Sequence, residues 1–111
     1  MRVSFGEYVL DTDRRQVLRG RRAVPLTPKG FALLALLVGR SPSAVSKSEI
    51  QDVLWPDIFV SDTNLFKLVF MVRRAIGAEG HRLRTVHRFG YAFAGELERE
   101  REAATPRGGL P

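Results

Sequence analysis

The sequence of 111 residues contains no cysteine, only two histidines and one tryptophan. Without cysteine there can be no disulfide, no thiolate nucleophile and no thiolate metal ligand. His87 has no serine or carboxylate partner at a fixed spacing, and a metal site would need a cluster of ligands that is absent. There is no glycine-rich phosphate-binding loop either. The sequence therefore predicts no enzyme, no metal, no cofactor and no small-molecule substrate.

Long apolar runs are also missing. The longest, over residues 31–38, has eight residues, whereas roughly 20 are needed to span a bilayer. The N-terminus does not resemble a signal peptide, because Arg2 is followed by alternating apolar and polar residues and not by an apolar segment. We therefore expect a cytoplasmic protein that has no membrane partner.

Acidic residues are fewer than basic ones. The chain has 18 Lys and Arg against 12 Asp and Glu, a net charge of +6. Residues 96–111 hold four Glu and three Arg, so the first 95 residues hold 15 basic and 8 acidic groups, a net charge of +7. A small domain with this charge attracts polyanions such as nucleic acids, although charge alone can also serve solubility.

Apolar and polar residues alternate over residues 2–26, and turn residues at 11–13 and at Gly20 divide this stretch into strands. Helical spacing follows, and then a hairpin pattern. The expected fold class is α+β, a winged helix-turn-helix with an N-terminal four-stranded antiparallel sheet, three helices and a C-terminal β-hairpin. The expected later elements are helices over 28–39, 47–55 and 62–76, a loop over 78–82, and strands over 83–87 and 91–94.

Local signals mark the ends of these elements. Thr27 is an expected N-cap, with Pro28 at the first helical position. Ser46 and Glu49 have the spacing of a capping box. In the hairpin turn, Gly90 is expected to supply a positive φ.

The composition changes after residue 95. Glu and Arg alternate, and Pro106 and Gly108-Gly109 follow. We expect a domain over 1–95 and a disordered tail or linker over 96–111. The linker-like composition leads us to expect a further domain beyond it.

The helix over 62–76 and the hairpin over 84–93 carry the candidate functional residues. Lys67 and Arg74 lie two turns apart on the outward face, where they could meet phosphates or guanine edges. A basic helix followed at once by a basic hairpin suits double-stranded DNA, with the helix in the major groove and the hairpin on the backbone or minor groove. The expected DNA-binding residues are Thr63, Lys67, Met71, Arg73, Arg74, Arg84, Thr85, His87 and Arg88.

Three large apolar residues, Phe66, Phe70 and Met71, share that outward face, which leaves the stripe Leu65, Leu68, Val69, Val72 and Ile76 for the core. Exposed apolar clusters are unusual. They could pack on thymine methyl groups, form a protein interface, or belong to the core if the helix phase is shifted by one residue. The second interpretation gives an alternative function, a protein–protein interaction module.

Taken together, these residues resemble the OmpR/PhoB-type winged-helix DNA-binding domain, the C-terminal effector of many bacterial response regulators. The resemblance covers about residues 3–94. It rests on Trp55-Pro56, Ser61-Asp62, the run Arg73 to Gly77, Arg84-Thr85-Val86-His87 and Gly90-Tyr91-Ala92-Phe93, in that order.

The resemblance implies a role in bacterial signal transduction and transcription regulation. It also implies a recognition helix over 62–76, a wing over 84–93, a loop over 56–61 that contacts RNA polymerase, and a homodimer on direct repeats. The chain departs from the family pattern where Phe66, Leu68, Phe70 and Met71 replace polar residues, and where His87 replaces a wing arginine. We expect no receiver domain within these 111 residues.

Overall fold

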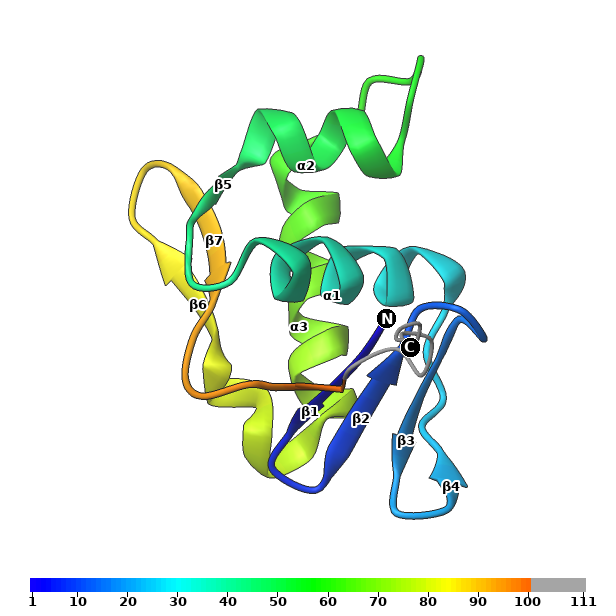
Figure 1. Ribbon diagram of the computed structural model, residues 1–111. Coiled ribbons are helices and arrows are strands. Elements are labelled where there is room, and N and C mark those ends of the chain that lie inside the picture. Colours follow the sequence, from blue (N-terminus) through cyan, green and yellow to red (C-terminus); the bar gives the residue numbers. More distant parts are fainter. Residues whose placement is uncertain (101–111) are drawn as a thin grey trace, which may run out of the picture.

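The computed structural model describes residues 1–100, which form two small antiparallel sheets and three α-helices (Figure 1). The first sheet has the strand order β4-β3-β2-β1-β8 and the second β5-β7-β6. The strands are β1 (Arg2–Phe5), β2 (Tyr8–Asp11), β3 (Gln16–Arg19), β4 (Arg22–Ala23), β5 (Val45–Ser46), β6 (Leu83–Val86), β7 (Gly90–Phe93) and β8 (Glu98–Glu100). The helices are α1 (Pro28–Arg40), α2 (Lys47–Leu54), α3 (Asp62–Ala75) and the 3-10 helix η1 (Gly77–Arg82).

The N-caps Thr27 and Ser46 lie where the sequence predicts them, and Ser61 is the N-cap of α3. The side-chain oxygens of Thr27, Ser46 and Ser61 accept hydrogen bonds from backbone N–H groups three residues later, at 3.0, 3.1 and 3.3 Å. These bonds satisfy donors that have no partner within the helix. The capping box at α2 is only half formed, because the Glu49 carboxylate pairs with Arg40 of α1.

The core lies between the helices and the two sheets. The α3 stripe over residues 65–76 is buried, as its spacing predicts, with Leu65, Val69, Val72 and Ile76 at 0% exposure. Phe5 of the first sheet meets Phe93 of the second edge-on, with ring centroids 5.1 Å apart. The two sheets and α3 therefore share one core. No helix within residues 1–100 is long and apolar enough to cross a membrane.

The strand β8 lies beyond residue 95, the expected domain limit. It pairs antiparallel with β1, with Arg2 opposite Glu100 and Ser4 opposite Glu98. The pairing runs through the backbone and all three β8 residues are exposed, so their alternating charges gave no apolar signal for a strand. Residues 101–111 of the expected tail lie outside the described residues.

The structure around the hairpin also differs from expectation. Residues 77–82 form η1 instead of a loop, and the two-residue strand β5 pairs with β7. The positive φ in the hairpin turn belongs to Arg88, at 61°, and not to Gly90. Gly90 is needed for space: a Cβ there would overlap the Val45 carbonyl oxygen and lie 2.9 Å from the Lys47 nitrogen.

Candidate nucleic-acid interface

The exposed face of α3 is centred on Thr63, Lys67, Phe70 and Arg74, which are all exposed. They fall at i, i+4, i+7 and i+11, so they form one stripe opposite the buried stripe. The Arg74 guanidinium carbon lies 5.8 Å from the centroid of the Phe70 ring. Asp62, in the first turn, is the acidic residue of α3, so the rest of the helix presents cations and apolar groups.

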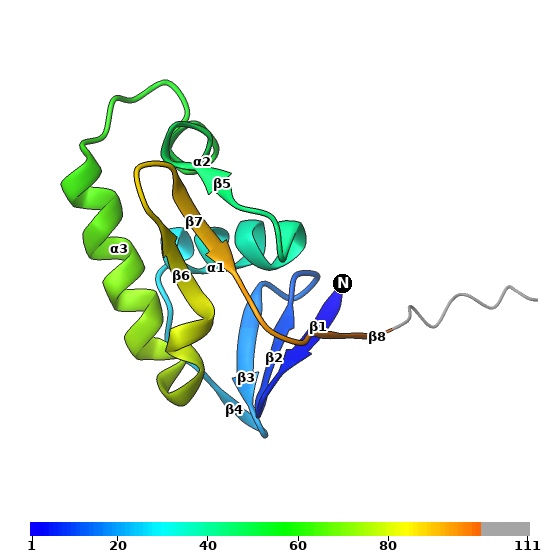
Figure 2. The ribbon, with the colours of Figure 1, turned by 90° about the vertical axis from the view of Figure 1, so that its left-hand side faces the viewer.

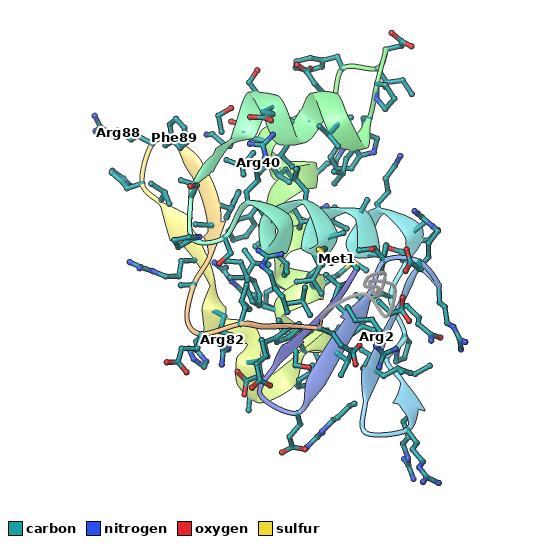
Figure 3. The ribbon with its side chains drawn as sticks, in the orientation of Figure 1. Met1, Arg2, Arg40, Arg82, Arg88 and Phe89 are labelled. Atoms are coloured by element: carbon teal, nitrogen blue, oxygen red, sulfur yellow. The ribbon has the colours of Figure 1, made fainter. Side chains whose placement is uncertain are left out.

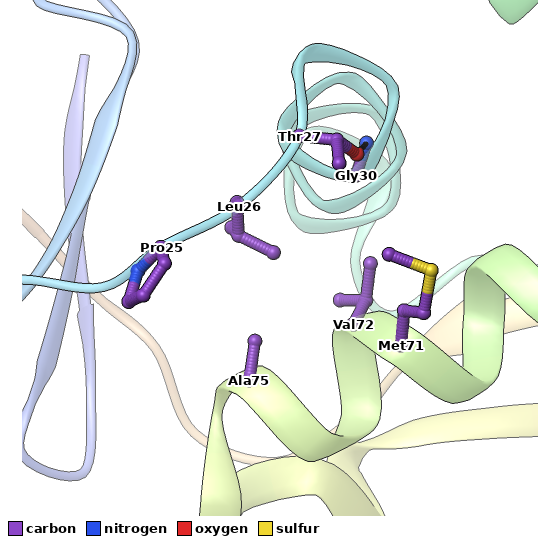
Figure 4. A pocket seen from close by; sticks show the side chains of 7 residues that line it. All are labelled: Pro25, Leu26, Thr27, Gly30, Met71, Val72 and Ala75. Atoms are coloured by element: carbon purple, nitrogen blue, oxygen red, sulfur yellow. Dashed lines mark hydrogen bonds between the residues drawn. The ribbon is translucent and has the colours of Figure 1, made fainter.

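The apolar residues on this helix are confirmed as exposed: Phe66 is 59%, Phe70 54% and Met71 48% exposed. The interpretation that the helix phase is shifted by one residue is therefore wrong. Met71 also lines a pocket between α3 and the start of α1, beside Thr27 and Gly30 (Figure 4). Phe66 and Phe70 do not line that pocket.

The hairpin β6–β7 lies beside α3 (Figure 2), and its turn projects from the side of the domain (Figure 1). The predicted contact residues Arg84, Thr85, His87 and Arg88 are all exposed. At the turn, the Phe89 backbone N–H donates to the Val86 carbonyl at 2.9 Å, and the Phe89 carbonyl accepts from the Lys47 N–H at 3.0 Å. The tip, with Arg88 and Phe89 (Figure 3), is thus attached to the start of α2.

Arg73 joins the helix to the hairpin. Its Nε donates to the Leu83 carbonyl at 2.8 Å and its Nη2 donates to Thr85 Oγ1 at 3.0 Å. The sequence predicts Arg73 and Thr85 as separate DNA contacts, whereas the structure brings them together. Arg73 is partly buried, and its hydrogen bonds position β6 against α3.

A second polar link, between α2 and α3, has no sequence signal. Asp62 accepts hydrogen bonds from Lys47 Nζ and from Gln51 Nε2, both at 3.1 Å. Gln51 Nε2 also donates to the Val60 carbonyl at 3.1 Å. The hydrogen bond from Lys47, then that from Gln51, and then the Lys47 charge hold the pKa of Asp62 below its ordinary value of 3.8. This link sets the direction in which α3 leaves the preceding loop.

The loop between α2 and α3 exposes two large apolar side chains. Phe59 is 94% exposed and Ile58 66% exposed. Asp57, just before them, has a φ of 66°, so the backbone turns sharply there. Two apolar side chains are thereby presented to solvent at one corner of the domain.

Over residues 20–93 the chain matches the family described as "Transcriptional regulatory protein, C terminal". It is 33% identical over 94 residues to the response regulator MprA of Mycobacterium leprae, covering 82% of this chain and 41% of that protein. The chain spans only 16% to 42% of the length of the first curated relatives that it matches.

Solved structures agree with this match. The DNA-binding domain of Bacillus subtilis CssR has a TM-score of 0.69 and 28% identity, covering 78% of this chain and 99% of that one. The Klebsiella pneumoniae RstA DNA-binding domain, solved in complex with the RstA box, has a TM-score of 0.70 and 23% identity, covering 84% and 96%. This chain therefore belongs to the family of transcriptional regulatory C-terminal domains, the OmpR/PhoB-type winged-helix DNA-binding domains of transcriptional regulators.

Proposed function

We propose that this domain binds double-stranded DNA with α3 in the major groove and the β6–β7 hairpin against the adjacent backbone or minor groove. The observation that carries the proposal is the pair of hydrogen bonds from Arg73 to β6. Because these bonds fix the hairpin relative to α3, Lys67 and Arg74 on the helix and Arg84 and Arg88 on the hairpin act as parts of one surface. A duplex meets such a surface with a groove and its bordering phosphates.

Charge supports the same assignment. The exposed α3 face carries cations after its first turn, and the hairpin adds Arg84 and Arg88. Lys and Arg side chains bind phosphates without regard to sequence and release counterions, so binding depends steeply on salt. Similarity to the RstA domain, solved with the RstA box, agrees with this proposal.

Fluorescence anisotropy with short random-sequence duplexes, repeated from roughly 50 to 200 mM salt, tests the proposal. We expect salt-dependent binding, and we expect Lys67→Ala or Arg74→Ala to weaken it and to reduce the salt slope by about one. Arg21→Ala removes the same charge from the turn between β3 and β4 and should leave the slope unchanged. Full affinity in both α3 variants would contradict the placement of α3.

The finer partners are also proposals. The exposed pair Ile58 and Phe59 supports contact between the loop over 56–61 and RNA polymerase, because a solvent-exposed apolar pair suits a protein surface. Family resemblance supports a homodimer on direct repeats, and the cytoplasm as the compartment where bacterial DNA lies. No specific feature favours the alternative, a protein–protein interaction module on α3.

A further inference from the structure

Building on the proposed DNA binding, we propose that α3 reads the 5-methyl groups of thymines through Phe66 and Phe70. The site recognised would then be defined by thymines in the major groove more than by guanine edges. Arginine forks usually read guanine, but the middle of this α3 face holds a phenyl ring.

Position and exposure carry the first step. Phe70 lies in the central stripe between Lys67 and Arg74, and Phe66 lies one turn earlier on the same side. Both rings are more than half exposed. A phenyl ring cannot exchange hydrogen bonds with a base edge, so the thymine methyl is the group in the major groove that it can bury.

The second step concerns what covers these rings. Lys67 and Arg74 lie in the same stripe, and the acid of α3, Asp62, is hydrogen-bonded to Lys47 and Gln51. A second copy packed on this face would bring cations together, and a purely apolar protein groove would leave them uncompensated. A duplex offers methyl groups inside the groove and phosphates along its edges, which matches both parts of the face.

The third step concerns Met71, which borders two hollows. It lines the pocket beside Thr27 and Gly30 (Figure 4), and it also lines an apolar hollow on the outer face with Phe66, Lys67 and Phe70. The Phe70 ring lies 5.8 Å from the Arg74 guanidinium carbon, and an arginine stacked on that ring can still direct its outer N–H groups to a phosphate. Phe66 and Phe70 are more exposed than Met71, so the two rings are the assigned thymine reader.

The test replaces thymine by uracil, which removes only the methyl group. Duplexes are first selected from a random thymidine-containing pool, and the selected sequences are then resynthesised with deoxyuridine. We expect the uracil duplexes to bind about four-fold more weakly for each thymine methyl that a ring would otherwise bury, the effect of one buried methyl-sized group. The salt slope should stay the same, because no phosphate contact changes.

Alanine variants test whether the two rings cause the difference in affinity between thymine and uracil duplexes. In Phe66→Ala and Phe70→Ala, each ring is replaced by a good helix former on an exposed face, so the melting temperature should change little. We expect the ratio of thymine to uracil affinity to fall toward one in the double variant. Phe59→Ala removes an exposed ring from the loop and should keep the wild-type ratio.

The outcomes are distinguishable. Salt-dependent binding with equal affinity for thymine and uracil duplexes overturns this inference and leaves the proposed DNA binding intact. No binding at the lowest salt overturns both. A dimer in sedimentation equilibrium that dissociates in Phe70→Asp assigns the face to a second copy and overturns the inference too.

Discussion

At the residue scale, Arg73 shows that a side chain predicted to contact DNA can also support the fold. Its charge and its place on α3 predict a DNA contact, which stays a prediction, and its guanidinium also donates hydrogen bonds to Leu83 and Thr85. The forked geometry of arginine lets two separate nitrogen atoms reach two acceptors on β6, whereas lysine has a single nitrogen at the end of its side chain. The side chain therefore contributes to the interface by placing the hairpin.

Arg73→Lys keeps the charge and should lower the free energy of unfolding by about 1 kcal/mol, because the two hydrogen bonds to β6 cannot both be kept. DNA affinity should fall as well, since the hairpin is less firmly held. Thermal melting and anisotropy measure the two effects. Arg74→Lys, at the neighbouring exposed position, should melt like the wild type, and an unchanged Arg73→Lys variant would show that the link is dispensable.

Asp62 makes the stability of the fold depend on pH. Because its pKa in the folded protein is lowered from 3.8, first by the hydrogen bond from Lys47, its stabilising effect is fully present above about pH 4. The effect is lost as the pH falls through the folded pKa. Asp62→Asn should therefore melt below the wild type at neutral pH, and the gap should close in acid. Asp52→Asn, at an exposed α2 position, serves as the control; a gap that persists in acid would argue against the ionised link.

At the element scale, the hairpin is held at its tip and at its base. The tip is attached to α2 through the Phe89 carbonyl and the Lys47 N–H, and β7 pairs with β5. Near the base, β6 is bonded to α3 through Arg73. A two-stranded hairpin is marginal by itself, so these attachments give the wing a fixed direction.

Gly90→Ala should disrupt this arrangement. Its Cβ would overlap the Val45 carbonyl oxygen, and backbone cannot move aside cheaply, so we expect a loss of about 2–3 kcal/mol in unfolding free energy. Gly39→Ala, on the exposed side of α1 with open space around it, should be neutral or stabilising by about 0.5–1 kcal/mol. Chemical denaturation compares the two. Equal stability of both variants would mean that β5 and β7 can separate without cost.

The loop before α3 should affect polymerase contact and not DNA binding. Phe59→Ser removes a ring that is 94% exposed, so folding and DNA affinity should stay as in the wild type. We expect RNA polymerase to bind the domain–DNA complex more weakly, as measured by mobility shift. Phe59→Tyr keeps the ring and serves as the matched control. Equal polymerase binding by both variants would exclude the loop as the contact.

At the scale of the whole molecule, the two sheets pack against the helices around one core, and the chain returns to its own N-terminal strand. Arg82, labelled in Figure 3, holds this return. Its Nη1 donates to the Glu96 carbonyl at 2.8 Å. Leu97 then packs against the core, and β8 covers the edge of β1. The folded unit therefore extends to residue 100 at least.

Truncation tests that limit. A chain ending at residue 95 should lose about 1–2 kcal/mol of stability, because Leu97 leaves the core and β1 becomes an open edge. A chain ending at residue 100 should melt like the full chain. Circular dichroism melting distinguishes them. If the two truncated chains melt together, β8 adds nothing to the fold.

The sequence by itself determined those elements that are marked by residues close together along the chain. Helix caps at Thr27 and Ser46 and the buried stripe of α3 follow from spacing, because helical period and capping involve residues only a few positions apart. The same spacing placed Phe66 and Phe70 on the outward face, and the structure excluded the alternative of a shifted helix phase. The family resemblance rested on the same short motifs, and it was confirmed by the match over residues 20–93.

Only the tertiary structure decided the contacts between distant residues. The pairing of β8 with β1, the bonds from Arg73 to β6 and the link from Asp62 to Lys47 join positions from 10 to 98 residues apart. Such pairs form between polar groups, through backbone or side-chain hydrogen bonds, and leave no periodic apolar pattern in the sequence. The roles of Arg73, as an internal support, and of Gly90, as a site of close backbone approach, depend on neighbours that folding brings to them.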